Sequence, residues 1–181
     1  MDLFQAQRLA AKQDVTADII EKDFLIEMLL FYLGKEPYFK EQFIFRGGTA
    51  IKKIYFSDYR FSEDLDFLLK KGRELEICRQ KFSQLAEKIN DDFPYSLTLS
   101  GGESEQERLQ LFIRYDIIPE IRSAKNLKID ILKDDVIPSY HKREIMFSYQ
   151  QFKSRHVEIS AYDLESMASD KICRILDVDN E

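Results

Sequence analysis

The chain has 181 residues, 44% of them hydrophobic and 13% aromatic, which suits one folded domain and excludes wholesale disorder. Its 27 Lys and Arg residues against 33 Asp and Glu residues give a formal net charge of −6. This balance argues against a protein coated in positive charge for non-specific nucleic-acid binding. A local basic groove stays open, because residues 122–155 hold eight Lys or Arg residues against four Asp or Glu residues.

The sequence also indicates a compartment. Cys78 and Cys173 stand in amphipathic patterns without CxxC spacing, which predicts free thiols in a reducing cytoplasm. The N-terminus lacks the basic and apolar regions of a signal peptide. The longest apolar run, residues 24–33, contains Glu27 and falls short of the roughly 20 residues that a membrane span needs. We therefore expect a soluble cytoplasmic protein with no membrane partner.

The first half of the chain is expected to alternate helices with two short strands. Thr16 is a suitable N-cap for the second helix, which Gly34 and Pro37 end. Aromatic and aliphatic runs before and after a Gly-Gly turn predict the strands. In chain order we expect helices over 2–12 and 17–33, a strand over 43–45, a helix over 49–56, a strand over 64–69 and a helix over 74–89.

Strand-like segments dominate the second half, separated by Gly101-Gly102 and by Pro119. A polar acidic loop over 101–107 is the segment that we expect to be most flexible. We expect strands over 95–99, 109–117, 127–132 and 157–159, followed by a helix over 161–176. Interleaved helices and strands followed by a cluster of strands predict an α+β or α/β domain, with a mixed β-sheet flanked by helices.

Two aspartates mark the second strand as a candidate metal site. Strand alternation places Asp64 and Asp66 on one face, and Leu65 and Phe67 on the other. Two carboxylates on one face repel each other unless a cation lies between them, and their oxygens suit Mg²⁺ or Mn²⁺. Taken alone, such a pair is more often a solvated strand face.

A third carboxylate favours the metal-site interpretation. In the segment 127–131, the same alternation buries the aliphatic residues and turns Lys128 and Asp130 to the opposite face. If this strand neighbours the Asp64 strand, Asp130 can complete a set of three acids. Three acids with two divalent ions are the usual apparatus for in-line attack on a phosphate.

The Gly-Gly turn before these aspartates is a candidate phosphate site. A strand, two glycines and a helix start allow backbone N–H groups to approach a phosphate, although most such pairs simply turn a chain. No Walker motif is present. The candidate contacts in and after this turn are Gly47, Gly48, Thr49, Lys53, Arg60 and Ser62, each of which is also compatible with an ordinary surface role.

Several of these segments occur together in one known family. The runs FIFRGGTAIKKIY (43–55) and RFSEDLDF (60–67) closely resemble the nucleotidyltransferase toxins of the AbiEii/AbiGii type. The runs EKDFL (21–25), KIDI (128–131), YDLE (162–165) and ASDK (168–171) are similar to motifs that flank or follow the core of that family. The resemblance covers roughly residues 19–176, and its stretch from GGT to DLDF is specific.

The resemblance implies a fold and an activity. The fold would be a nucleotidyltransferase fold of the polymerase-beta type, within the α+β class, formed by residues 1–181 as a single domain. We expect a helical N-terminal part over 1–40, a catalytic sheet core over 41–160 and a closing helix over 161–181. The activity would be transfer of a nucleotide from an NTP to an acceptor, such as the 3′ end of tRNA. Such proteins are toxins of toxin–antitoxin or phage-defence pairs, restrained by a separately encoded antitoxin protein.

The resemblance also assigns roles to residues. Asp64, Asp66 and Asp130 would be the catalytic residues and the ligands of Mg²⁺ or Mn²⁺, with Asp130 also assisting deprotonation of the acceptor hydroxyl. The triphosphate would contact Gly47, Gly48, Thr49, Arg60 and Ser62. Lys128 and Lys171 are candidates for contacts to phosphate or to the base.

Two departures from the family pattern leave alternatives open. Asp170 stands where relatives usually have Glu. The chain also ends at Glu181, before the Arg-Asp-Leu-Tyr-Asp-like segment and the helical C-terminal domain that commonly follow, so we expect a fragment or a shortened member. One alternative is therefore a catalytically silent or truncated partner-binding module of the same fold. Another is an NTP-dependent kinase-like toxin.

Overall fold

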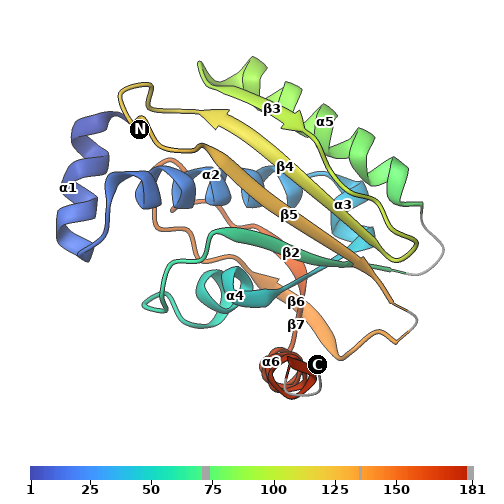
Figure 1. Cartoon of the computed structure of the whole chain (residues 1–181). Coiled ribbons are helices and arrows are strands. Elements are labelled where there is room, and N and C mark those ends of the chain that lie inside the picture. Colours follow the sequence, from blue (N-terminus) through green and yellow to red (C-terminus); the bar gives the residue numbers. More distant parts are fainter. Residues whose placement is uncertain (71–73, 135, 179–181) are drawn as a thin grey trace.

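A computed structural model of the chain describes residues 1–70, 74–134 and 136–178 (Figure 1). Its helical elements are α1 (Leu3–Gln13), α2 (Ala17–Leu33), α3 (Pro37–Gln42), α4 (Gly47–Ala50), the π-helical turn η1 (Ile51–Tyr55), α5 (Leu75–Asp92) and α6 (Leu164–Val178). Its strands are β1 (Phe43–Arg46), β2 (Asp64–Leu69), β3 (Ser96–Ser100), β4 (Arg108–Asp116), β5 (Asn126–Lys133), β6 (Tyr140–Glu144) and β7 (Glu158–Tyr162).

The strands form one mixed sheet in the order β3-β4-β5-β2-β1-β7-β6. Strand β2 lies between β1, to which it is antiparallel, and β5, to which it is parallel. Strand β7 pairs parallel to β1 on the other side. The predicted α+β class with a mixed sheet flanked by helices is therefore confirmed.

One face of the sheet is packed and the other is more open to solvent. Along β4 the burial alternates, with Leu109, Leu111, Ile113 and Tyr115 buried and the residues between them partly or fully exposed. Helix α5 covers the packed face beside β3 and β4 (Figure 1). This alternation leaves the opposite face of β2, β4 and β5 free to carry polar side chains.

Helix α2 is buried on nearly all sides, including three acidic residues. Glu21 and Glu27 are fully buried and Asp23 is 4% exposed. Buried carboxylates need partners, and Glu21 accepts hydrogen bonds from the backbone N–H groups of Ile117 and Ile118. Within the described part of the chain, no helix combines the length and hydropathy that crossing a membrane requires.

The structure corrects three sequence-based expectations. Strand β6 was not predicted, because Tyr140–Glu144 is polar and mostly exposed and shows no alternation; it forms by edge pairing with β7. The last helix begins at Leu164 rather than at residue 161, since Ala161 lies in β7 beside β1. The helix expected over 49–56 is a short α-helical turn followed by the π-helical turn η1.

Candidate active site

The three predicted acids lie on adjacent strands. Asp66 of β2 stands directly opposite Asp130 of β5, and Asp64 stands opposite Lys128. All four side chains share the more open face of the sheet, because the residues between them, such as Leu65 and the alternate residues of β5, are buried on the other face. The expected neighbourhood of the two strands is therefore confirmed.

The glycine turn packs directly against the second aspartate. Gly47 has a φ of +81°, a backbone conformation that residues other than glycine rarely adopt. A Cβ atom at this position would lie 2.1 Å from Oδ2 of Asp66. Glycine is therefore required here both by the backbone conformation and by the close approach of the carboxylate.

The rest of the turn is fixed to the start of β2. The hydroxyl of Thr49 donates a 2.5 Å hydrogen bond to the backbone carbonyl of Asp64. A Cβ atom at Gly48 would lie 3.1 Å from Oγ of Ser62, so the turn and the residues before β2 are in close contact. Thr49 is 1% exposed and acts beneath the site rather than within it.

A pocket of about 200 Å³ opens above the turn. The predicted site residues that line it come from the turn, from the segment before β2, from β2 and from α6: they are Gly47, Gly48, Arg60, Ser62, Asp64, Asp66 and Lys171. Thr49, Lys53, Lys128 and Asp130 do not line it. Residues far apart in the sequence thus converge on one small polar pocket.

Arg46 and Asp170 also line this pocket and were not assigned a role from the sequence. The guanidinium of Arg46 lies 2.7 Å from Oδ2 of Asp170 and 5.3 Å from the ring centroid of Tyr162. This ion pair ties α6 to the end of β1. The available signal was a charged residue at the end of an apolar strand, directly before the two glycines.

Lys171 follows Asp170 in α6, and its side chain reaches the segment that leads into β2. Its ammonium donates a 3.1 Å hydrogen bond to the hydroxyl of Tyr59. This hydrogen bond, together with the charge of the ammonium, lowers the pKa of Tyr59.

Lys52 orders the segment that carries Arg60 and Ser62, a role that the sequence did not indicate. Its ammonium donates hydrogen bonds to the backbone carbonyls of Ser57 at 3.1 Å and Tyr59 at 2.7 Å. Burial lowers the pKa of Lys52. Because these carbonyls belong to the turn between η1 and β2, the lysine holds Arg60 and Ser62 toward the pocket.

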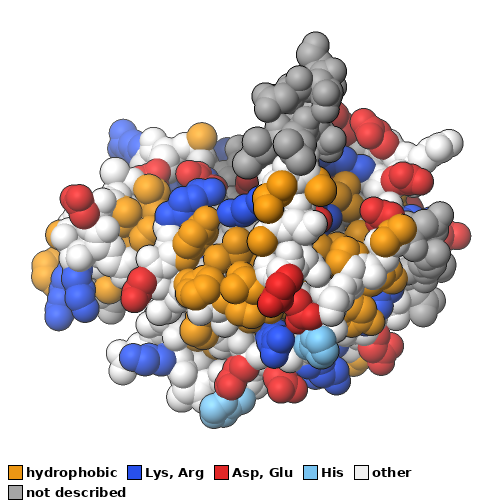
Figure 2. Space-filling model, turned by 90° about the horizontal axis from the view of Figure 1, so that it is seen from below, with side chains coloured by type: hydrophobic (Ala, Val, Ile, Leu, Met, Phe, Trp, Pro, Cys, Tyr) orange, Lys and Arg blue, Asp and Glu red, His pale blue; other side chains and the backbone are white. Residues whose placement is uncertain are grey.

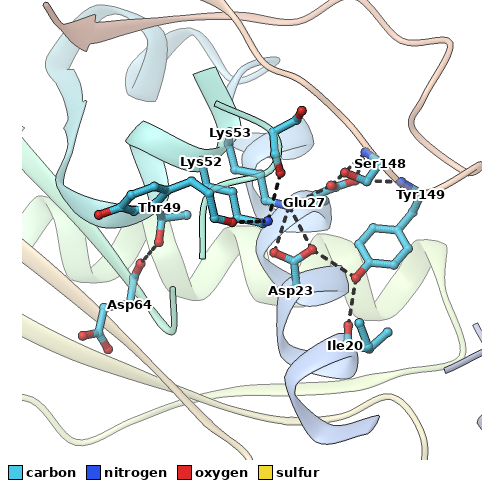
Figure 3. Close-up of polar contacts among 11 residues, drawn as sticks. Ile20, Asp23, Glu27, Thr49, Lys52, Lys53, Asp64, Ser148 and Tyr149 are labelled. Atoms are coloured by element: carbon cyan, nitrogen blue, oxygen red, sulfur yellow. Dashed lines mark hydrogen bonds and ion pairs between the residues drawn. The ribbon is translucent and has the colours of Figure 1, made fainter. Parts of the chain in front are cut away.

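Lys53 was predicted to contact the nucleotide, and the structure places it elsewhere (Figure 3). It is 1% exposed, and its ammonium lies 2.9 Å from Oδ2 of Asp23 and 2.8 Å from Oε1 of Glu27. Spacing alone put Lys53 about one turn beyond the glycines, but η1 directs it toward α2 and not toward the pocket.

Comparisons with known proteins bear on this arrangement. The family model described as "Nucleotidyl transferase AbiEii toxin, Type IV TA system" matches residues 29–181. The chain belongs to the AbiEii family. This finding confirms the resemblance carried by the GGT and DLDF segments. No curated protein matches the chain.

A solved structure of a nucleotidyltransferase toxin has a similar fold. It is MenT4 from Mycobacterium tuberculosis H37Rv, with a TM-score of 0.64 and 16% sequence identity over 87% of this chain. The matched region covers 53% of MenT4, so the present AbiEii chain spans about half the length of that protein. At this identity the likeness shows the fold, and it agrees with the predicted nucleotidyltransferase fold.

Divalent ions are implied by the AbiEii fold, and the acids of this chain suit them by their chemistry. Asp64, Asp66 and Asp130 offer hard carboxylate oxygens from neighbouring strands on one face. Within residues 1–70, 74–134 and 136–178, however, no three acidic, His or Cys side chains gather as a metal-binding group. Cations of the protein already engage two of the acids: Arg108 contacts Asp130 through both carboxylate oxygens, and the ammonium of Lys128 lies 3.7 Å from Asp64.

Proposed function

We propose that this chain transfers a nucleotide from an NTP to an acceptor hydroxyl, and that it acts as the toxin of a toxin–antitoxin or phage-defence pair. The observation that carries the proposal is the alignment of Asp66 with Asp130 on adjacent strands, behind a glycine turn that contacts Asp66. Membership of the AbiEii family supports the same activity.

The acids would hold the divalent ions, Mg²⁺ or Mn²⁺, through Asp64, Asp66 and Asp130. When bound, such ions neutralise the triphosphate and favour loss of pyrophosphate. Asp130 is the carboxylate that would accept the proton of the acceptor hydroxyl, because it lies on β5, at the side of Asp66 away from β1 and the glycine turn that follows it.

The pocket residues would bind the triphosphate. Gly47 and Gly48 stand at the start of α4 and line the pocket, and their backbone N–H groups would donate to a phosphate. Arg60, Ser62 and Lys171 line the same pocket and would donate to phosphate oxygens. Lys128 lies next to this group and would contact a phosphate or the base.

The proposed acceptor is an RNA, such as the 3′ end of tRNA. The basic excess of residues 122–155 offers less free charge than the sequence suggested, because several of its cations are paired. Lys125 contacts Glu21 and Asp116, and Arg143 contacts Asp163. Viewed from below, basic and acidic side chains are mixed around hydrophobic ones (Figure 2). We therefore place the acceptor near the acids and not along one basic surface.

The experiment is incubation of the chain with tRNA, Mg²⁺ and an NTP labelled at the α- or the γ-phosphate. Nucleotidyl transfer predicts α label on the RNA and no γ label. An Asp66→Asn variant should lose about 10³-fold or more of this transfer, because a metal-binding acid is removed without a change in size. The γ label on the acceptor would instead identify a kinase-like toxin. No label from either NTP, across tRNA and protein acceptors, would contradict transfer and favour a partner-binding module held by its antitoxin.

A further inference from the structure

Arg108 makes a two-pronged ion pair with Asp130 at the candidate site. Its Nε lies 2.9 Å from Oδ1 of Asp130, and its terminal nitrogen lies 2.6 Å from Oδ2. Two parallel charge-assisted hydrogen bonds of this kind fix both oxygens of a carboxylate. Both oxygens of Asp130 therefore accept from a residue that the sequence did not single out.

A second carboxylate, that of Asp66, lies beside this ion pair. Asp130 is the direct neighbour of Asp66 across the β2–β5 ladder. Two adjacent carboxylates repel each other unless a cation compensates them. In this structure the compensating cation at Asp130 is a guanidinium, and it contacts both of the oxygens to which a divalent ion would bind.

We propose that Arg108 competes with the divalent ion for Asp130, so that its side chain must leave before Asp130 can join Asp64 and Asp66 at a metal. This inference rests on the proposed function, since it concerns the metal that nucleotidyl transfer requires. Arg108 is thus a positioning residue that controls how readily the third acid becomes available.

The surroundings of Arg108 allow this movement. Its side chain is 44% exposed, whereas that of Asp130 is 12% exposed, so the arginine can turn into solvent while the aspartate stays in place. Its backbone remains fixed, because the carbonyl of Arg108 accepts a 2.8 Å hydrogen bond from the N–H of Glu105. A change of side-chain rotamer is therefore sufficient, with no change in the sheet.

The test is a titration of the full chain with Mn²⁺ alone, followed by electron paramagnetic resonance of free Mn²⁺. Arg108→Gln should bind Mn²⁺ about tenfold more tightly than the unmodified chain, because a competing charge-assisted pair is lost. Arg108→Lys keeps the charge but not the two-pronged contact. Its Mn²⁺ affinity should lie between that of the unmodified chain and that of Arg108→Gln. Arg114→Gln is the matched control, since Arg114 lies on the same strand and face, opposite Asn126; it should bind Mn²⁺ as the unmodified chain does.

A metal-free measurement separates the pair from the metal. In EDTA, urea unfolding of Arg108→Gln, Asp130→Asn and the double variant should show coupling of about fivefold or more in the unfolding equilibrium constant. Saturating Mn²⁺ should reduce this coupling toward one.

The outcomes distinguish this inference from the proposed function. Equal or weaker Mn²⁺ binding by Arg108→Gln, in a chain that binds Mn²⁺ and loses it in Asp66→Asn, would overturn the role of Arg108 alone. Absence of Mn²⁺ binding in the unmodified chain and in every variant, with and without NTP, would overturn the metal site and the competition together.

Discussion

Two groups of charged residues, one buried against α2 and one on the more open face of the sheet, differ in what surrounds them; Figure 3 shows the buried one. The buried cluster consists of Asp23, Glu27, Lys53, Ser148 and Tyr149, and its three charged side chains are at most 4% exposed. The site cluster consists of Asp64, Asp66, Arg108, Lys128 and Asp130. Three of its side chains, those of Asp64, Arg108 and Lys128, are between 32% and 46% exposed.

Burial, and not residue type, separates the ion pairs of the buried cluster from those at the candidate site. Glu27 accepts from Lys53 and from the backbone N–H groups of Ser148 and Tyr149. The hydroxyl of Tyr149 donates to Asp23, and burial followed by the nearby carboxylates raises the pKa of Tyr149. The charged side chains of the buried cluster are thus almost inaccessible to solvent, whereas solvent reaches Asp64, Arg108 and Lys128 of the site cluster.

The largest expected effect comes from breaking the buried cluster. Lys53→Met would leave two carboxylates on α2 without their shared cation and should destabilise the fold by about 3–5 kcal/mol. Urea denaturation followed by circular dichroism measures this change. Lys88→Met is the control, since Lys88 pairs with Glu36 at a solvent-exposed position and its loss should leave the denaturation midpoint nearly unchanged. Equal losses in the two variants would contradict the distinction between the clusters.

The second prediction concerns the contact between the glycine turn and the site. Gly47→Ala forces a left-handed backbone on alanine and places its Cβ against Asp66, so it should cost about 2–4 kcal/mol and displace the carboxylate. Gly101→Ala is a matched control, because Gly101 has a φ of +57° and no atom within 4 Å of an added Cβ. It should cost only about 1–2 kcal/mol.

Both alanine variants carry the strain of a left-handed backbone. The difference between their losses of stability therefore measures the crowding of Asp66 alone. Denaturation midpoints give the stabilities, and Mn²⁺ affinity should fall in Gly47→Ala but not in Gly101→Ala. Unchanged Mn²⁺ binding in Gly47→Ala would show that the turn does not position the acid.

Much of this arrangement could be predicted from the sequence, because it follows from local periodicity. Alternation in β2 and β5 placed Asp64, Asp66 and Asp130 on one face, and the ladder between the two strands bears this out. Strand β6 could not be predicted in the same way, since an exposed edge strand carries no apolar alternation.

The missed residues depend on long-range geometry. Arg108 and Asp130 are 22 residues apart, and their contact follows from the register of β4 with β5, which sequence alone does not give. Lys53 was assigned to the nucleotide by its distance from the glycines, but the π-helical turn and the acids of α2 decide its direction. Arg46 meets Asp170 only because α6 returns to the end of β1.

The third prediction concerns a smaller change within the buried cluster. Tyr149→Phe removes a hydroxyl that lies 3.0 Å from Oδ2 of Asp23 and 3.2 Å from the carbonyl of Ile20. The loss of this buried donor, whose single proton the two acceptors share, should cost about 1–2 kcal/mol, without a change in Mn²⁺ affinity. Urea denaturation and the Mn²⁺ titration measure the two quantities. A clear change in Mn²⁺ affinity would mean that the buried cluster and the site cluster are coupled through η1.

The smallest expected effect on stability lies within the site cluster. Lys128 and Asp64 are 3.7 Å apart and partly exposed, so Lys128→Gln should change the free energy of unfolding by no more than about 0.5 kcal/mol, and less at high salt. Its Mn²⁺ affinity should rise less than that of Arg108→Gln, because Lys128 makes one long contact where Arg108 makes two short ones. A loss of stability as large as that of Lys53→Met would contradict this prediction. The pairing of Lys128 with Asp64 would then be required for folding, and a bound ligand could not replace it.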